Sequence, residues 1–374
     1  MRFLEDWPPT EQALRREAAS LEALLLPFVG RLSPLLIGEA AWRRAWERVR
    51  GLPVTLAAFP FGFELPLHEP RPIADLGLSL LGDSLSEEFY TAGARRADAD
   101  PVTRALARLL DETRAGDSAL RRVAGRKMML EYDVPRTPDE TAPHPGVFLY
   151  PAAGVLIGGA FEERRSDLGV VVDALVAALG WEPDALERRE AERVFAALAP
   201  GAAIRGVGAF LSRSRAIRLA VTDFRNASEL VAFLERADWR GNRGLVASVA
   251  GRMERRHAFG TLGVHLDVRP DGLGTNLGLS FFPSAGEWVK DIEPWRALLD
   301  GLGEDGLAIP DKLSALKETS CGQEPVLGRA GSYLLLRGIH HVKLVLNPER
   351  VEQVKAYVFW LLRHTRPAAA GSGR

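Results

Sequence analysis

Apolar and polar positions along the chain follow two alternating periods. Stretches with apolar residues every third or fourth position, as in amphipathic helices, precede paired stretches in which every second residue is apolar, as in strands. This order recurs five times. Turns between the paired strands are expected near Pro70–Ile73, Arg136–Pro145, Arg213–Arg215, Asp271–Gly274 and Arg337–Gly338. The pattern predicts five units, each with two helices followed by two strands.

Five such units predict an α+β fold with ten antiparallel strands. A ring of equal units closes naturally into a barrel, which leaves no strand edge to protect. We therefore expect an antiparallel β-barrel with a solvated lumen and a surrounding ring of helices. An open sheet covered on one side is the alternative. A single domain is expected over residues 1–366, followed by a disordered tail over residues 367–374.

The last unit is expected to contain two short strands and a final helix. The strands are assigned to Tyr333–Arg337 and His340–Leu346, and the closing helix to Glu349–His364. This assignment places Lys355 and Tyr357 on the helix, as surface and core residues rather than catalytic ones.

The strand-like stretches separate apolar from polar residues. In the fourth hairpin, Val264 and Leu266 alternate with His265 and Asp267. The apolar set should face the helices and the polar set the lumen. Because isolated charges in a dry core would be costly, such a lumen must be a solvated chamber for a ligand. The predicted lumen residues are Glu64, His68, Asp75, Ser79, Lys127, Glu131, Asp133, Arg218, His265, Asp267, Asn276, Ser280, Phe282, His341 and Lys343.

Composition excludes several classes of function. The 374 residues carry a net charge of −1 with scattered Lys and Arg, so no footprint for nucleic acid or an anionic membrane is present. The single cysteine, Cys321, excludes an internal disulfide and favours a cytoplasmic location. No signal peptide and no apolar run long enough to cross a membrane is recognised. Oligomeric state is left open.

Three segments and the order of elements resemble a known family. The segments are LGVHLDVRPDGLGTNLGLSFFP at 262–283, RAIRLAV at 215–221 and HHVKLVL at 340–346. Together with five ααββ units over Thr10–His364, they resemble the ABBA family of prenyltransferases, which includes aromatic, indole and cyanobactin-type peptide enzymes. The resemblance implies transfer of an isoprenoid group from a prenyl diphosphate to an aromatic small molecule or a peptide side chain inside the barrel.

The resemblance also implies roles for individual residues. Basic residues on successive strands would clamp the diphosphate: Lys127, Arg218 and Lys343, with His341 as a further hydrogen-bond donor. Fixed cations at these positions would stabilise the charge of the leaving group. Glu64 would be the base on the acceptor side, with Glu131 or Asp267 as substitutes, and His265 would relay a proton or bind phosphate.

The chain departs from the family pattern in two respects. Only five tyrosines are present and few fall on lumen positions, so Phe282 and other apolar residues would replace the tyrosine shield of the allyl cation. Five predicted lumen carboxylates face three firm cations, an acidic excess for a diphosphate site. No cofactor is implied, although magnesium ions could compensate this excess. No DDxxD motif for metal-dependent terpene chemistry is present.

Two other functions stay open at this point. The acidic lumen would suit a non-catalytic barrel that binds a peptide or a cationic small molecule. Alternatively, His265, Asp267 and His341 could serve a metal-dependent or acid–base tailoring enzyme. Since adjacent strand residues point to opposite faces, only one of His340 and His341 is expected to face the lumen.

Overall fold

The structure is a computed structural model that describes residues 7–137, 139–141, 143–152, 156–157, 162–256, 260–283 and 291–365. The predicted disordered tail, 367–374, lies outside the described residues.

Helices precede each pair of strands, as the sequence predicts. They are α1 (Trp7–Glu17), α2 (Leu21–Leu25), α3 (Glu39–Val49), α4 (Leu85–Gly93), α5 (Pro101–Arg114), α6 (Ala119–Ala124), α7 (Glu162–Ala178), α8 (Ala185–Ala196), α9 (Ala227–Arg236), α10 (Arg243–Arg256), α11 (Glu293–Glu304) and α12 (Pro310–Thr319). Several helices are capped at their N-terminus by a side chain. Asp100 accepts hydrogen bonds from two backbone N–H groups of α5, and Asn226 accepts one from a backbone N–H group of α9.

The strands form one antiparallel sheet. They are β1 (Phe61–Pro66), β2 (Asp75–Leu81), β3 (Lys127–Tyr132), β4 (Gly146–Leu149), β5 (Leu156–Ile157), β6 (Ala203–Phe210), β7 (Ile217–Phe224), β8 (Thr261–Arg269), β9 (Gly272–Leu273), β10 (Leu277–Phe282), β11 (Gly322–Gly328), β12 (Gly331–Leu346) and β13 (Val351–Thr365).

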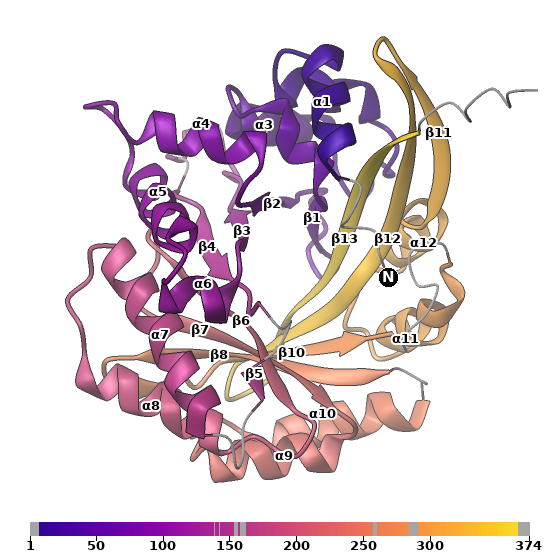
Figure 1. Cartoon of the computed structure of the whole chain (residues 1–374). Coiled ribbons are helices and arrows are strands. Elements are labelled where there is room, and N and C mark those ends of the chain that lie inside the picture. Colours follow the sequence, from indigo (N-terminus) through magenta and orange to yellow (C-terminus); the bar gives the residue numbers. More distant parts are fainter. Residues whose placement is uncertain are drawn as a thin grey trace, which may run out of the picture.

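The sheet closes on itself as a ten-stranded barrel, which confirms the predicted fold. Neighbouring strands follow the order β1-β2-β3-β4-β6-β7-β8-β10-β12-β13, and β13 pairs with β1 to complete the ring. Figure 1 shows the helices around the outside of these strands. The strand β11 pairs only with β12, where β12 and β13 extend beyond the rest of the barrel.

The last unit differs from the prediction. The expected turn at Arg337–Gly338 lies inside the continuous strand β12, and the expected helix over Glu349–His364 is the strand β13. The true turn lies between them, where Asn347 Oδ1 accepts hydrogen bonds from two backbone N–H groups. From Val354 to Trp360 of β13 every second residue is buried, among them Val358. This period of two is that of a strand with one face packed on the helices.

The hydrophobic core lies between the barrel and its helical coat. Trp360 of β13 is fully buried and contacts Phe63 of β1 and Trp42 of α3, at ring-centroid distances of 5.4 and 6.5 Å. Outward strand residues such as Leu266 and Leu344 are also fully buried. The apolar face of each strand therefore packs against the helices, and the polar residues face the inside of the barrel.

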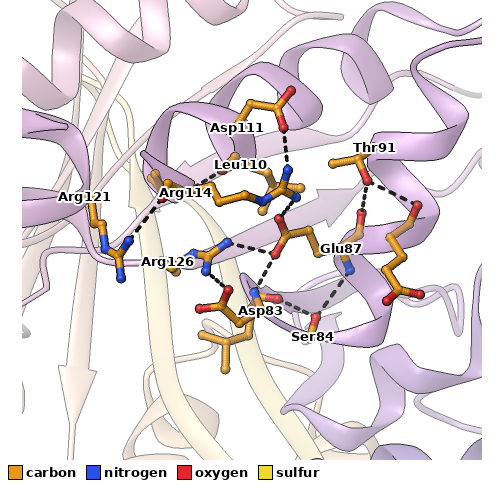
Figure 2. A network of polar contacts seen from close by, with 12 residues as sticks. Asp83, Ser84, Glu87, Thr91, Leu110, Asp111, Arg114, Arg121 and Arg126 are labelled. Atoms are coloured by element: carbon orange, nitrogen blue, oxygen red, sulfur yellow. Dashed lines mark hydrogen bonds and ion pairs between the residues drawn. The ribbon is translucent and has the colours of Figure 1, made fainter. Parts of the chain in front are cut away.

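Glu87 at the start of α4 joins the coat to the barrel wall (Figure 2). Its buried carboxylate accepts hydrogen bonds from Arg126 at 2.9 Å and from the backbone N–H of Asp83 at 2.5 Å, and it pairs with Arg114 of α5. Ser84 caps the same helix, since its Oγ accepts a hydrogen bond from the backbone N–H of Glu87. Because Arg126 directly precedes β3, this network fixes where that strand begins.

Candidate active site in the barrel

A group of titratable side chains meets inside the barrel. We call it the central cluster; its members are Glu64 (β1), Glu131 (β3), Arg218 (β7), His265 (β8), Lys343 (β12), and Lys355 and Tyr357 (β13). Lys343 interacts electrostatically with Glu64, Glu131, Lys355 and Arg218. Burial raises the pKa of Glu131, and the charge of Lys343 opposes that rise. The sequence-predicted residues Glu64, Glu131, Arg218, His265 and Lys343 are thus brought together.

Glu64 is held by two residues of the last strand. Its Oε1 lies 2.5 Å from Lys355 Nζ, and its Oε2 accepts a hydrogen bond from the Tyr357 hydroxyl. Burial alone would raise the pKa of Glu64, but the ammonium groups of Lys355 and Lys343 outweigh it and lower the pKa. Glu64 is therefore an ionised carboxylate whose two oxygens are both engaged.

Lys343 and Lys355 lie directly opposite each other on neighbouring strands. Like charges in this position repel, and the carboxylate of Glu64, which interacts with both ammonium groups, compensates only one of the two charges. Lys343 is 6% exposed, and burial lowers its pKa to about 8. Its ammonium lies 4.4 Å from the centre of the Tyr357 ring, and within the described part of the chain it has no ion pair.

Buried polar atoms without partners lie on the strands beside Lys343. Ser280 on β10 is the register partner of Lys343. Two residues earlier on β10, Gly278 is the register partner of His265 on β8. Among the described residues, Ser280 Oγ, His265 Nδ1 and His341 Nε2 are buried with no hydrogen-bond partner. Native proteins rarely leave such atoms unsatisfied, so this wall is suited to a polar ligand.

The predicted acidic excess is offset by arginines. Asp267 forms a two-point ion pair with Arg218, at 2.8 and 3.0 Å, although burial alone would raise its pKa; the pair keeps that pKa low. Asp133 is bound by Arg213 at 2.6 Å. Asp75 is bound by Arg136, also at 2.6 Å, but burial and the charge of Glu64 raise its pKa to about 6. Arg136 and Arg213 come from hairpin turns, outside the strands that the alternation pattern describes.

Lys127, another predicted diphosphate ligand, has its own neighbours, Tyr150 and His340. It begins β3, four positions before Glu131, which corresponds to about 13 Å along a strand. Its ammonium lies 4.9 Å from the centre of the Tyr150 ring, and burial lowers its pKa with no charged group contributing. Loss of solvation inside the barrel lowers the pKa of His340 to about 4, although this residue keeps contact with solvent, and the charge of Lys127 contributes to the lowering. Lys127 therefore interacts with His340, which is hydrogen-bonded to the predicted ligand His341.

The expectation that His340 and His341 face opposite sides is wrong. A register shift between Ile339 and His341 interrupts the alternation, and the two Nδ1 atoms lie 2.8 Å apart in a hydrogen bond. Such bulges redirect side chains beside functional sites. His341 also stacks on Tyr357, with ring centroids 4.0 Å apart and planes inclined by 12°.

Aromatic rings line the inner wall where the strands carry glycine. A Cβ at Gly208 would lie 2.1 Å from the ring of Phe148, one at Gly146 2.6 Å from Phe210, and one at Gly263 2.9 Å from Phe282. These glycines let the rings lie flat against the neighbouring strand. One of these rings contacts a cation, since the Arg218 guanidinium lies 5.3 Å from the centre of the Phe210 ring. Aromatic rings, including Phe148, Phe210 and Phe282, thus line the inner wall of the barrel.

Of the remaining predicted lumen residues, His68 and Asn276 lie outside the strands, whereas Ser79 is on the same face of β2 as Gly77, the register partner of Glu131. His68 follows β1 and its Nδ1 is 3.1 Å from the carbonyl oxygen of Val354, in a surface pocket that also contains Leu307 and Arg350. Asn276 is exposed in the turn before β10. Ser79 is buried on β2, opposite Met129.

The described residues contain no group of three or more His, Cys, Asp or Glu arranged to hold a metal ion. His265, Asp267 and His341 do not form such a group, because the Asp267 carboxylate is bound by Arg218. Nor do the described residues contain a helix long and apolar enough to span a membrane.

The sequence reasoning missed Lys355 and Tyr357. The signal was present, because Val354, Ala356 and Val358 alternate with Lys355 and Tyr357 just as in the correctly predicted strands. The wrong helix assignment removed both residues from consideration.

Comparison with solved structures identifies the fold. AnaPT from Neosartorya fischeri is similar over 94% of this chain and 97% of its own, with a TM-score of 0.57 at 13% identity. The apo form of the prenyltransferase PriB is similar over 94% of this chain and 100% of its own, with a TM-score of 0.54 at 15% identity. A PriB ternary complex with L-tryptophan and dimethylallyl thiolodiphosphate gives 0.52 at 15% identity, over 94% of this chain and 99% of its own. The expected likeness to ABBA prenyltransferases is confirmed for the fold.

Comparisons by sequence give no match. No family model matches the chain, and no curated protein does.

Proposed function

We propose that this protein transfers an isoprenoid group from a prenyl diphosphate to an aromatic acceptor inside its barrel. The observation that carries the proposal is the pair of opposed lysines, Lys343 and Lys355, beside the ionised Glu64. The barrel shared with PriB and AnaPT supports it, since PriB has been solved with a prenyl diphosphate analogue and an aromatic amino acid.

The diphosphate is assigned to Lys343 and Lys355, with Ser280 and His265 as hydrogen-bonding partners. Two opposed ammonium groups gain most from an anion that carries more than one charge. Arg218 contributes less, because Asp267 already neutralises it. Lys355 thus takes the place in the clamp that the sequence assigned to Lys127, and binding of diphosphate by Lys127 stays a prediction.

The chemistry follows from these positions. The bond between C1 of the prenyl group and the diphosphate oxygen breaks, and both electrons leave with the diphosphate, whose developing charge the lysines stabilise. The rings of Phe148, Phe210 and Tyr357 shield the allyl cation from water. A ring carbon of the acceptor forms the new bond, and the proton lost from that carbon passes to Glu64, or to Glu131, whose raised pKa suits a proton acceptor.

The reduced acidic excess argues against a lumen built for a cationic ligand. Asp75, Asp133 and Asp267 each have an arginine partner. The carboxylates left in the central cluster are Glu64 and Glu131, which face Lys343 and Lys355.

The test is incubation of the purified protein with dimethylallyl, geranyl or farnesyl diphosphate, and with L-tryptophan, simple indoles and tryptophan-containing peptides as acceptors. Mass spectrometry should detect an acceptor enlarged by one prenyl group. Lys343→Met should abolish product and donor binding, while Lys317→Met, on the outer helix α12, should change neither. Absence of saturable binding of every donor to the wild-type protein would contradict the proposal.

A further inference from the structure

Glu64 and the proposed diphosphate site share one residue, Lys355. Its ammonium lies 2.5 Å from Glu64 Oε1, and its backbone position is directly opposite Lys343. The same side chain is therefore a partner of the candidate base and a neighbour of the candidate leaving-group site.

The cations around the site differ in whether they already have an ion-pair partner. Asp267 engages two nitrogens of Arg218, so that guanidinium is already compensated. Lys343 has no ion-pair partner in the described part of the chain and lies over the Tyr357 ring. A diphosphate carries more negative charge than one ammonium neutralises, and Lys355, with 20% of its side chain exposed, is the lysine directly opposite Lys343.

Lysine is suited to such an exchange. Its ammonium is a compact charge on a flexible stem with three rotatable donors, in contrast to the planar fork of arginine. Tyr357 would stay behind, because its hydroxyl donates to the other oxygen of Glu64. Departure of Lys355 would leave Oε1 free while Tyr357 keeps the carboxylate in position.

We propose that Lys355 exchanges partners: it holds Glu64 until the donor binds, then moves to the donor's diphosphate and frees Glu64 Oε1 for the acceptor. This inference rests on the proposed function. Lys355 and Tyr357 are then positioning residues for Glu64. Donor and acceptor should bind cooperatively, since each raises the affinity of the protein for the other.

Inorganic pyrophosphate is the probe, with affinity measured by calorimetry at fixed pH and ionic strength. Lys355→Met should weaken binding about tenfold. Glu64→Asp keeps the charge but retracts the carboxylate from Lys355, so it should tighten binding by a few fold. Glu64→Gln should tighten it further. In the Lys355→Met background, Glu64→Asp should give no gain, and Glu64→Gln should give no more than the removal of one charge gives.

Glu131→Gln is the matched control, because Glu131 is a carboxylate of the same cluster without a lysine ion pair in the described part of the chain. It removes the same charge and should have the same effect with or without Lys355. Equal effects of Glu64→Gln and Glu131→Gln in both backgrounds, with no gain from Glu64→Asp, would overturn the exchange while leaving donor binding intact. Failure of the wild-type protein to bind pyrophosphate or any donor would instead overturn the proposed function. Thermal melting of each variant confirms that it is folded.

Discussion

Lys343 and Lys355 lie opposite each other on the last two strands of the barrel, and both carry ammonium groups toward the same carboxylate, Glu64. A protein that needed only a stable barrel would not gain from this repulsion. Glu64 balances one of the two positive charges, and an anionic substrate would balance the other.

The affinity for pyrophosphate should fall as pH rises above 8. Burial lowers the pKa of Lys343 to about 8, so above that pH the neutral amine prevails and attraction for an anion is lost. The decline should approach about tenfold per pH unit for a single group. Titration calorimetry from pH 7 to pH 9.5 measures it. Lys343→Arg, which stays charged throughout, should flatten the profile; an unchanged decline in this variant would assign the titration to another group.

Arg218→Ala should destabilise the fold more than it weakens donor binding. The change leaves Asp267 without its two-point partner inside the barrel, and the pKa of Asp267 should rise from its present low value. The double variant Arg218→Ala/Asp267→Ala should recover much of the lost stability. Chemical denaturation of the single and double variants measures this coupling. Additive losses would show that the pair does not act as a unit.

Glu87→Gln should lower the free energy of unfolding by about 3 kcal/mol. The change removes the buried charge that Arg114 and Arg126 share and weakens the joint between α4, α5 and β3. Denaturation by urea measures the effect. The neighbouring Glu88→Gln, at an exposed position, is the control and should be nearly neutral. Equal behaviour of the two variants would contradict the role of Glu87.

Glu11→Gln should stabilise the protein above neutral pH. Burial raises the pKa of Glu11 from 4.5 to about 7, so between these values the folded protein retains a proton that the unfolded chain has lost. Stability from this group is therefore present at low pH and is lost as pH rises through that window.

The glutamine variant removes this dependence and should gain roughly 2 kcal/mol at pH 8 relative to wild type, with little change at pH 4. Melting curves at both pH values measure the difference. Glu39→Gln, at an exposed carboxylate of α3, should show no such pH-dependent gain. A wild-type pH profile in the Glu11 variant would refute the assignment.

The sequence was most informative where strand alternation was uninterrupted. His265 and Asp267 alternate with fully buried Val264 and Leu266, and their inward placement follows directly. The bulge at Ile339–His341 could not be predicted, because it depends on how β12 pairs with β13. For the same reason the sequence did not indicate that His340 and His341 would bond to each other.

The arginine partners of the lumen carboxylates could not be predicted from the alternation of apolar and polar residues either. Arg136 and Arg213 project from turns, where no periodicity assigns a direction, yet they bind Asp75 and Asp133. The segment over β13 was misread because Lys, Gln, Ala and Leu also favour helices, and its pairing with β1 overrides that preference. Because β13 was assigned as a helix, Lys355 and Tyr357 were not predicted to face the lumen.

The pairing of β1 with β13 also bears on how the protein is made. Glu64 emerges from the ribosome early, whereas Lys355 and Tyr357 follow only after almost all the other strands. Until then β1 has an unpaired edge, and unpaired edges in nascent chains invite association with other chains. A chain released before β13 would have neither a closed barrel nor the partners of Glu64. The barrel can therefore close, and Glu64 can gain its partners, only after β13 has been made.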